Sequence, residues 1–257
     1  MRFLARLITT LIALGSILWC QAQHLHQLTE EEIGSVRFPT TCSKSTEASF
    51  SLAVALLHSF QYELARNAFM DISREDQNCA MAYWGVGMSY YNGFANSLDL
   101  DDGRRALQKA QQLATASKTT SAREKDYVNA LAEIYRDGAD SSARAEGFEQ
   151  KMRALQTAYP GDTEAALFHA LALGITAQRR TDRTYANQRE CGNILEPIFR
   201  EISTPPRSRS LFNPLLRQSC ARGKRSGRRS RLRKDRSSIL PRAPHALAHL
   251  HSVGVVG

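Results

Sequence analysis

Residues 50–91, FSLAVALLHSFQYELARNAFMDISREDQNCAMAYWGVGMSYY, decide the fold of this chain. Phe50, Val54 and Leu57 recur at the i, i+4, i+7 spacing that places side chains on one face of a helix. The same periodicity continues directly afterwards in a second segment. The stretch therefore predicts helices that pack in pairs through apolar faces.

The pattern of this stretch recurs after 34 residues, which is the length of a tetratricopeptide repeat. Residues 52–56 (LAVAL) match the element of the first helix of such a repeat, and residues 65–69 (ARNAF) match that of the second. Residues 86–90 (VGMSY) repeat the first element in register. Small residues let neighbouring helices approach, and aromatic residues fill the space between them. The spacing predicts stacked helical hairpins.

The remaining periodic segments extend this pattern to about eight helices without a strand. A loop rich in Gly, Asn and Asp is expected over residues 92–102, and Ser121 and Thr163 are expected to cap two of the later helices. The sequence therefore predicts an all-α fold, a tetratricopeptide-like α-solenoid over residues 47–202. The later helices are expected at residues 103–116, 121–135, 143–159, 164–176 and 185–202.

The N-terminus has the composition of a secretory signal peptide. Two arginines precede an apolar run that is too short for a membrane span, and a small residue, Ala22, stands ahead of a polar stretch. We expect cleavage after residue 22, export to the periplasm or medium, and no membrane span in the mature chain. A lipid-modified Cys20 and a retained anchor are the alternatives. Residues 23–46 are interpreted as a polar lead-in.

The net charge of +9 belongs to the C-terminal segment. Residues 203–257 hold thirteen Lys and Arg but one acid, Asp235, so they carry +12 and the rest of the chain carries −3. The segment is rich in Arg and Ser, without helical periodicity, and is predicted to be disordered. Because the predicted helical body is mildly acidic, the composition does not favour specific nucleic-acid binding.

Four cysteines remain after signal cleavage. In an oxidising compartment Cys42 and Cys79 can pair, which would tie the lead-in to the second repeat. Alternatively, both are small buried apolar residues. The cysteine and histidine spacings match no zinc motif, so the sequence predicts no metal ligand.

Few side chains stand out as functional. His58 and His169 are interpreted either as packed, hydrogen-bonded helix residues or as ligand-binding groups. Tyr83, Trp84 and Tyr91 are candidates for a concave groove, with helix packing as the other interpretation of Trp84. No nucleophile elbow, phosphate loop, zinc-protease or dinucleotide motif occurs. We therefore predict no catalytic residue and no cofactor, and the sequence favours a non-enzymatic protein while leaving an enzyme open.

Longer runs of residues carry a family resemblance. The chain resembles a family of exported bacterial tetratricopeptide-repeat proteins over residues 38–202, and the resemblance implies a helical-repeat fold and an envelope location. The family continues with a His-rich half that includes H-P-G-x-A-H-Y, Y-A-K-I-A-P and H-M-P-S-H-I-F, and these motifs do not occur in this chain. The matching runs stand at residues 38–42 (FPTTC), 55–60 (ALLHSF), 65–69 (ARNAF), 79–85 (CAMAYWG), 133–137 (EIYRD), 163–173 (TEAALFHALAL) and 184–188 (TYANQ).

The basic segment is compatible with a change of reading frame. When codons for residues 244–256 are chosen and read from their second base, they can spell His-Met-Pro-Ser-His-Ile-Phe, and residues 213–220 and 231–238 permit two more family motifs in the same frame. We therefore expect a base gained or lost near codons 203–207, which sequencing the DNA tests. The helix at 185–202 would then lack its next neighbour and expose an apolar stripe.

Two functions follow as expectations. The first is an exported scaffold whose concave face binds a protein or peptide, since helical repeats present such surfaces. The second is a metal-binding protein or enzyme whose His-rich half is missing from this chain. A nucleic-acid-binding function driven by the basic segment is a third and weaker interpretation.

Overall fold

The computed structural model describes residues 36–179 and 184–202, so the predicted signal peptide and the basic C-terminal segment lie outside the described residues. The described residues form eight α-helices, one 3-10 helix and one two-stranded hairpin. No helix among them has the length and hydropathy to cross a membrane. The helices are α3 (Glu47–His58), α4 (Tyr62–Glu75), α5 (Ala80–Ser89), α6 (Leu100–Ala116), α7 (Ala122–Ile134), α8 (Ser141–Ala158), α9 (Thr163–Arg179) and α10 (Ala186–Ile202), with η1 (Lys44–Thr46) before α3.

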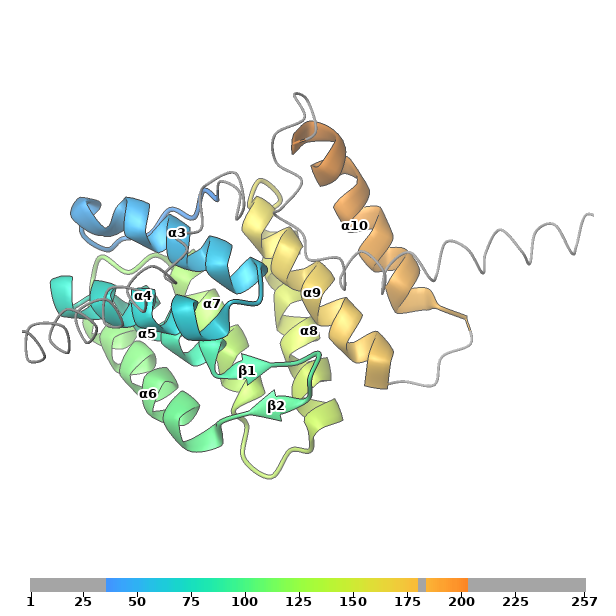
Figure 1. The fold of residues 1–257 in the computed structure, drawn as a ribbon, viewed down its shortest axis with the longest axis horizontal. Coiled ribbons are helices and arrows are strands. Elements are labelled where there is room, and N and C mark those ends of the chain that lie inside the picture. Colours follow the sequence, from blue (N-terminus) through green and yellow to red (C-terminus); the bar gives the residue numbers. More distant parts are fainter. Residues whose placement is uncertain (1–35, 180–183, 203–257) are drawn as a thin grey trace, which may run out of the picture.

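The prediction of an all-α fold is confirmed. Each helix packs on the next one along the chain, from α3 to α10, and α5 also packs on both α3 and α7 (Figure 1). The helix boundaries follow the apolar periodicity to within a few residues. Short turns between antiparallel neighbours make this order of packing the natural outcome for amphipathic helices.

The loop after α5 differs from the expectation. It contains a short antiparallel hairpin of β1 (Tyr91–Asn92) and β2 (Ser97–Leu98), in which Tyr91 stands opposite Leu98. Asn96, with φ of 53°, provides the left-handed residue that closes the turn. Strands of two residues are too short to show the alternation of apolar and polar residues that predicts a strand.

Two glycines set the close approach of α5 to its neighbours. A Cβ added at Gly85 would overlap the ring of Phe69 on α4, and one at Gly87 would lie 2.8 Å from a methyl group of Leu131 on α7. Helix α5 therefore fits between α4 and α7 because these positions carry no side chain. This close packing is the physical reason for the small residues that the repeat pattern carries at these positions.

The core is aromatic and joins helices that are far apart in sequence. Trp84 on α5 contacts Tyr127 on α7 and Phe168 on α9, with ring centroids 5.5 and 5.6 Å apart. Phe38 inserts from the N-terminal side, with its ring 5.5 Å from that of Trp84 and 5.0 Å from that of Tyr127. The ring of His58 on α3 lies 4.8 Å from that of Phe168.

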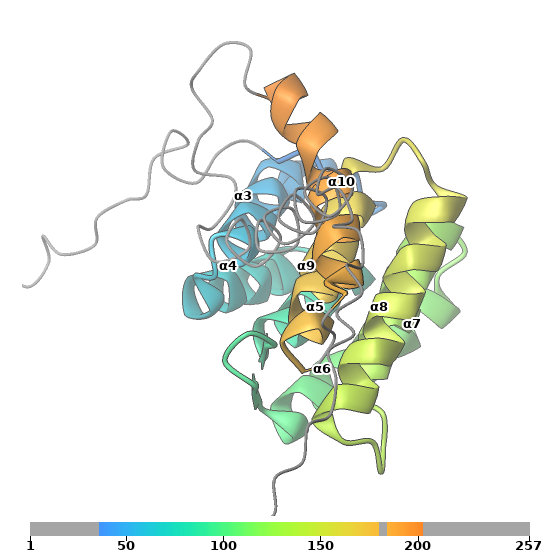
Figure 2. The same ribbon diagram turned by 90° about the vertical axis from the view of Figure 1, so that its right-hand side faces the viewer.

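This arrangement departs from the strictly neighbour-to-neighbour packing that the sequence predicts. Helix α9 lies between the α3–α4 hairpin and the α7–α8 hairpin (Figure 2), and His58 of α3 contacts Glu164 of α9. The inner helices, by which we mean the first helix of each hairpin (α3, α5, α7 and α9), thus curl tightly enough for α3 and α9 to meet. Aromatic side chains fill the space that a wider curl would leave as a groove.

Helix α10 corrects the expectation of an exposed apolar stripe. Leu195 is buried, and Ile194 and Ile198 pack beside it against α9 in a cluster that includes Leu167 and Leu173. This part of the stripe therefore faces α9, the preceding helix of the same hairpin.

Candidate functional site

The candidate site is built around the N-terminal segment of residues 36–46, which we call the strap. Its Phe38 is 2% exposed within the aromatic core, and a disulfide joins its Cys42 to Cys79 at the start of α5. The Sγ–Sγ distance is 2.00 Å and the Cα atoms lie 4.9 Å apart. Residues 36–46 of the predicted polar lead-in are thus an anchored part of the fold, and its residues 23–35 lie outside the described residues.

A buried glutamate holds the strap against α7. Glu124 is 1% exposed, and its Oε1 accepts a hydrogen bond of 2.7 Å from the backbone N–H of Thr41. Both carboxylate oxygens also accept from the Thr41 hydroxyl, at 3.0 and 2.8 Å. The same glutamate completes a capping box with Ser121, which confirms the predicted cap of this helix. Glu124 therefore both stabilises the N-terminus of α7 and holds the strap in place.

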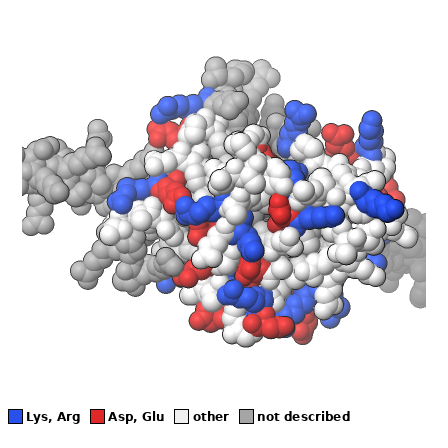
Figure 3. Space-filling view, turned by 180° about the vertical axis from the view of Figure 1, so that it is seen from behind, with Lys and Arg blue, Asp and Glu red and all other residues white. Residues whose placement is uncertain are grey.

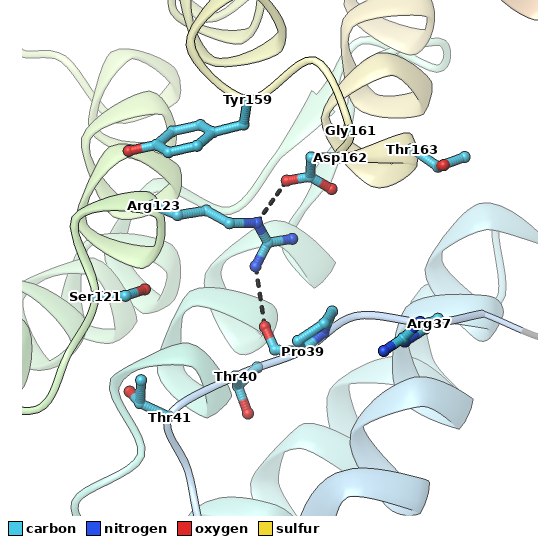
Figure 4. A pocket seen from close by; sticks show the side chains of 10 residues that line it. All are labelled: Arg37, Pro39, Thr40, Thr41, Ser121, Arg123, Tyr159, Gly161, Asp162 and Thr163. Atoms are coloured by element: carbon cyan, nitrogen blue, oxygen red, sulfur yellow. Dashed lines mark hydrogen bonds and ion pairs between the residues drawn. The ribbon is translucent and has the colours of Figure 1, made fainter.

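An arginine–aspartate pair links the strap, α7 and α9 (Figure 4). Arg123 donates from Nε to Asp162 Oδ2 at 2.5 Å and from Nη1 to the carbonyl oxygen of Pro39 at 2.9 Å. Its guanidinium also lies over the rings of Phe38 and Tyr127, 4.6 and 4.9 Å from their centroids. Burial opposes the charge of Arg123, but the bond to Asp162 and nearby negative groups raise its pKa above the usual value.

Asp162 uses both carboxylate oxygens inside the protein. Besides Arg123, Oδ2 accepts from the Tyr127 hydroxyl at 2.9 Å, and burial beside this carboxylate raises the pKa of Tyr127. Oδ1 accepts from the backbone N–H groups of Glu164 and Ala165 at 3.1 and 3.3 Å. Asp162 thus caps α9 in place of the predicted Thr163, because its carboxylate reaches the first free N–H groups of the helix.

A pocket of about 770 Å³ lies between the strap, the start of α7 and the turn that precedes α9 (Figure 4). Most of its lining side chains carry hydroxyl or guanidinium groups, and the pairs described above fix the position of its walls. The lining residues are Arg37, Pro39, Thr40, Thr41, Ser121, Arg123, Tyr159, Gly161, Asp162 and Thr163.

The charge of this pocket is positive. Arg123 and Asp162 neutralise each other, whereas Arg37 is exposed and forms no ion pair with any residue in the described ranges. The opposite view of the molecule shows Lys and Arg interspersed with Asp and Glu and no continuous patch of one sign on that face (Figure 3). The site thus combines an exposed guanidinium that has no ion pair among the described residues with walls of Thr, Ser and Tyr hydroxyl groups.

A second, more polar pocket of about 530 Å³ lies beside the β1–β2 hairpin. The guanidinium of Arg66 covers the ring of Tyr90 at 4.8 Å from its centroid, and Asp99 caps α6 by accepting from the backbone N–H of Asp102. Its cation and its acids are thus already engaged in packing and capping. The second pocket therefore offers a ligand fewer charged groups without a partner than the first pocket does.

The two histidines singled out in the sequence have carboxylate or amide partners. His58 Nε2 lies 2.6 Å from Glu164 Oε2. His169 lies 2.5 Å from Gln156 Oε1 through Nδ1 and 3.2 Å from Glu149 Oε1 through Nε2. Nε2 of His58 and both ring nitrogens of His169 are therefore occupied by structural contacts in this conformation.

The aromatic groove candidates lie apart from the two pockets described above. Trp84 is 1% exposed and Tyr91 is 7% exposed, so both belong to the core, and Tyr83 is half-buried at its edge. His58, Tyr83, Trp84 and Tyr91 are not brought together as one surface. The reason is the tight curl of the inner helices, which turns the expected concave face into core.

Sequence reasoning missed the residues that form the first pocket. The FPTTC run of residues 38–42 could have indicated that this segment is anchored, because Phe38 is buried in the core and Cys42 forms a disulfide. A polar segment before the first helix is, however, typical of a linker. Comparison of the chain with protein-family models, with curated proteins and with solved structures found no match.

Proposed function

We propose that this protein is an exported tetratricopeptide-like scaffold that binds an acidic peptide segment of a partner protein in the cell envelope. The observation that carries the proposal is the pocket between the strap and the starts of α7 and α9, with Arg37 unpaired within the described residues at its rim. A carboxylate of the partner is the chemical complement of that guanidinium.

The pocket is preorganised for such a ligand. The Arg123–Asp162 pair, the Glu124–Thr41 bonds and the Cys42–Cys79 disulfide fix its walls before a ligand arrives. Binding then costs less ordering of the protein, which favours affinity. Hydroxyl groups such as those of Thr40 and Thr163 are suited to the backbone N–H and C=O groups of an extended peptide.

Two features support the repeat architecture and the export that the proposal includes. The order of packing, helix by helix along the chain, is that of stacked hairpins, and Gly85 and Gly87 allow the close contacts between them. A disulfide between Cys42 and Cys79 is typical of proteins in oxidising compartments.

Selection from a phage-displayed library of random peptides, with the oxidised full chain as bait, tests the proposal. We expect the selected peptides to carry Asp, Glu or a free C-terminal carboxylate. Arg37→Glu should weaken their binding at least about tenfold, because one charge-assisted hydrogen bond is lost and repulsion replaces it. A C-terminally amidated version of each peptide tests the C-terminal carboxylate, and a version with Asn or Gln in place of Asp or Glu tests the side-chain carboxylates.

Two further variants locate the binding site. Thr163→Trp fills the pocket from an exposed position and should abolish binding. Lys125→Ala, at an exposed lysine of the same helix α7 that does not line the pocket, should leave it unchanged. Peptides that lack acidic groups and bind Arg37→Glu as well as the parent protein would rule out the proposal.

A further inference from the structure

The disulfide that anchors the strap has a third neighbour. The Sγ atoms of Cys42 and Cys79 and a carboxylate oxygen of Asp76 all lie within 4.8 Å of one another. Asp76 follows directly on α4, Cys79 precedes α5, and Cys42 comes from the strap. Three ligand atoms from two distant segments thus converge, although their spacing along the sequence shows no zinc motif.

We infer that reduction of the Cys42–Cys79 disulfide converts this cluster into a thiolate–carboxylate site for a divalent cation of the Zn²⁺ class. Two thiolates and one carboxylate form an accepted donor set for Zn²⁺, with solvent as the fourth ligand. Ligand atoms bound to one such ion lie about 3.5–4 Å apart, so modest side-chain rotations after the bond breaks suffice.

The carboxylate is already held in place for this role. Oδ2 of Asp76 accepts a hydrogen bond of 2.8 Å from the backbone N–H of Ser43 in the strap, and Oδ1 accepts one of 3.0 Å from that of Asn78. Both donors are backbone N–H groups, and each oxygen keeps a lone pair for a cation. Backbone donors of this kind orient carboxylate ligands in metal sites.

The position of Cys79 favours its thiolate form after reduction. It is the N-cap of α5, and its Sγ accepts a hydrogen bond of 3.2 Å from the backbone N–H of Ala82. A sulfur at a helix N-terminus is stabilised when it carries negative charge. Cys42 is half-buried at the same site, so a reductant and a cation have a path from solvent.

A dithiol serves as the reductant of the Cys42–Cys79 disulfide. The dithiol supplies two electrons and two protons, the Cys42–Cys79 bond breaks, each Sγ gains one hydrogen, and the reductant closes its own disulfide. A divalent cation then displaces both thiol protons to solvent and binds the two thiolates. The cluster thus has two mutually exclusive states, an oxidised covalent one and a reduced metal-bound one.

Co²⁺ binding to the full chain tests this inference. The protein is reduced with a phosphine, desalted without oxygen and titrated with Co²⁺, whose thiolate charge-transfer band in the near ultraviolet reports sulfur ligation. We expect one Co²⁺ per reduced chain at this site and none at the oxidised site. Absence of the band from the reduced protein would overturn the inference.

Variants assign the ligands and exclude the other cysteines, since the chain contains five. Cys42→Ser/Cys79→Ser should remove the band, and Asp76→Asn should weaken Co²⁺ binding by at least about tenfold. Asp71→Asn, an exposed acid one turn earlier on α4, is the matched control and should bind like the parent chain. A band that persists in the double serine variant, or an affinity that Asp76→Asn leaves unchanged, contradicts the site.

Circular dichroism covers the case in which reduction unfolds the chain. Co²⁺ should then restore the helical signal together with the thiolate band, because metal binding and folding are coupled when the ligands come from distant segments. A reduced chain that stays unfolded with excess Co²⁺ counts against the inference as firmly as a missing band.

Discussion

His58 on α3 and Glu164 on α9 lie 2.6 Å apart although 106 residues separate them. Their side chains are 9% and 5% exposed, so the contact is made away from water. The pair joins the first helix of the described fold to the seventh, and it does so at the edge of the aromatic core where Phe168 contacts the His58 ring. The closed curl of the inner helices is therefore fixed by a polar contact as well as by packing.

Removal of either partner should destabilise the protein. Glu164→Leu or His58→Leu leaves a buried polar group without its partner, and each should lower the free energy of unfolding by about 1–3 kcal/mol. The double variant should lose less than the sum of the two, because no unpaired group remains. Urea denaturation measures all three, and Asp71→Ala in an exposed pair with Arg74 should change it by less than about 0.5 kcal/mol.

A methyl group at Gly85 should disturb the contact between α4 and α5. Gly85→Ala places its Cβ in the ring of Phe69, and overpacking of this kind costs about 1–3 kcal/mol. Gly161→Ala is the control, because nothing lies within 4 Å of a Cβ built there. Equal melting temperatures for the two variants would show that α5 shifts freely.

Phe38 should contribute more to stability than its place in a loop-like segment implies. Phe38→Ala removes a buried ring that contacts three other aromatic rings, and the expected loss is about 3–5 kcal/mol. Leu52→Ala, at a leucine that is 44% exposed on α3, should cost far less. Chemical denaturation compares them, and a small effect at Phe38 would show that the strap is not part of the core.

Acid should weaken the contact between Glu149 and His169. Burial alone would raise the pKa of Glu149, but hydrogen bonds from His169 and Arg153 outweigh it and lower the pKa below the usual value. A carboxyl with a lowered folded pKa stabilises the protein fully above its unfolded pKa, about 4.3, and loses that contribution as pH falls through the folded value.

The stability difference between the parent chain and Glu149→Gln should therefore be largest near neutral pH and shrink below about pH 4. Urea midpoints at several pH values measure it. Glu63→Gln, at an exposed glutamate on α4, supplies the baseline for a carboxyl without such partners. A difference that is constant between pH 7 and pH 3.5 would contradict this prediction.

The sequence predicts the helices because their signal is local. The spacing of Phe50, Val54 and Leu57 requires only the geometry of one helix, and the Ser121 cap requires only its own turn. The pocket could not be predicted because it depends on contacts between distant segments. Thr41 meets Glu124 across 83 residues, and Arg123 meets Pro39 across 84, and no periodicity records such contacts.

The long reach of the strap also sets an order of events during synthesis. The strap leaves the ribosome before α7, and Glu124 and Arg123 follow 83 and 84 residues after their strap partners, or about 4–17 s later at ordinary rates of translation. Until α7 emerges, Phe38 has no completed core to enter. A nascent chain that ends before α7 therefore lacks the contacts of Glu124 and Arg123 with the strap, and the strap gains them only when α7 has emerged.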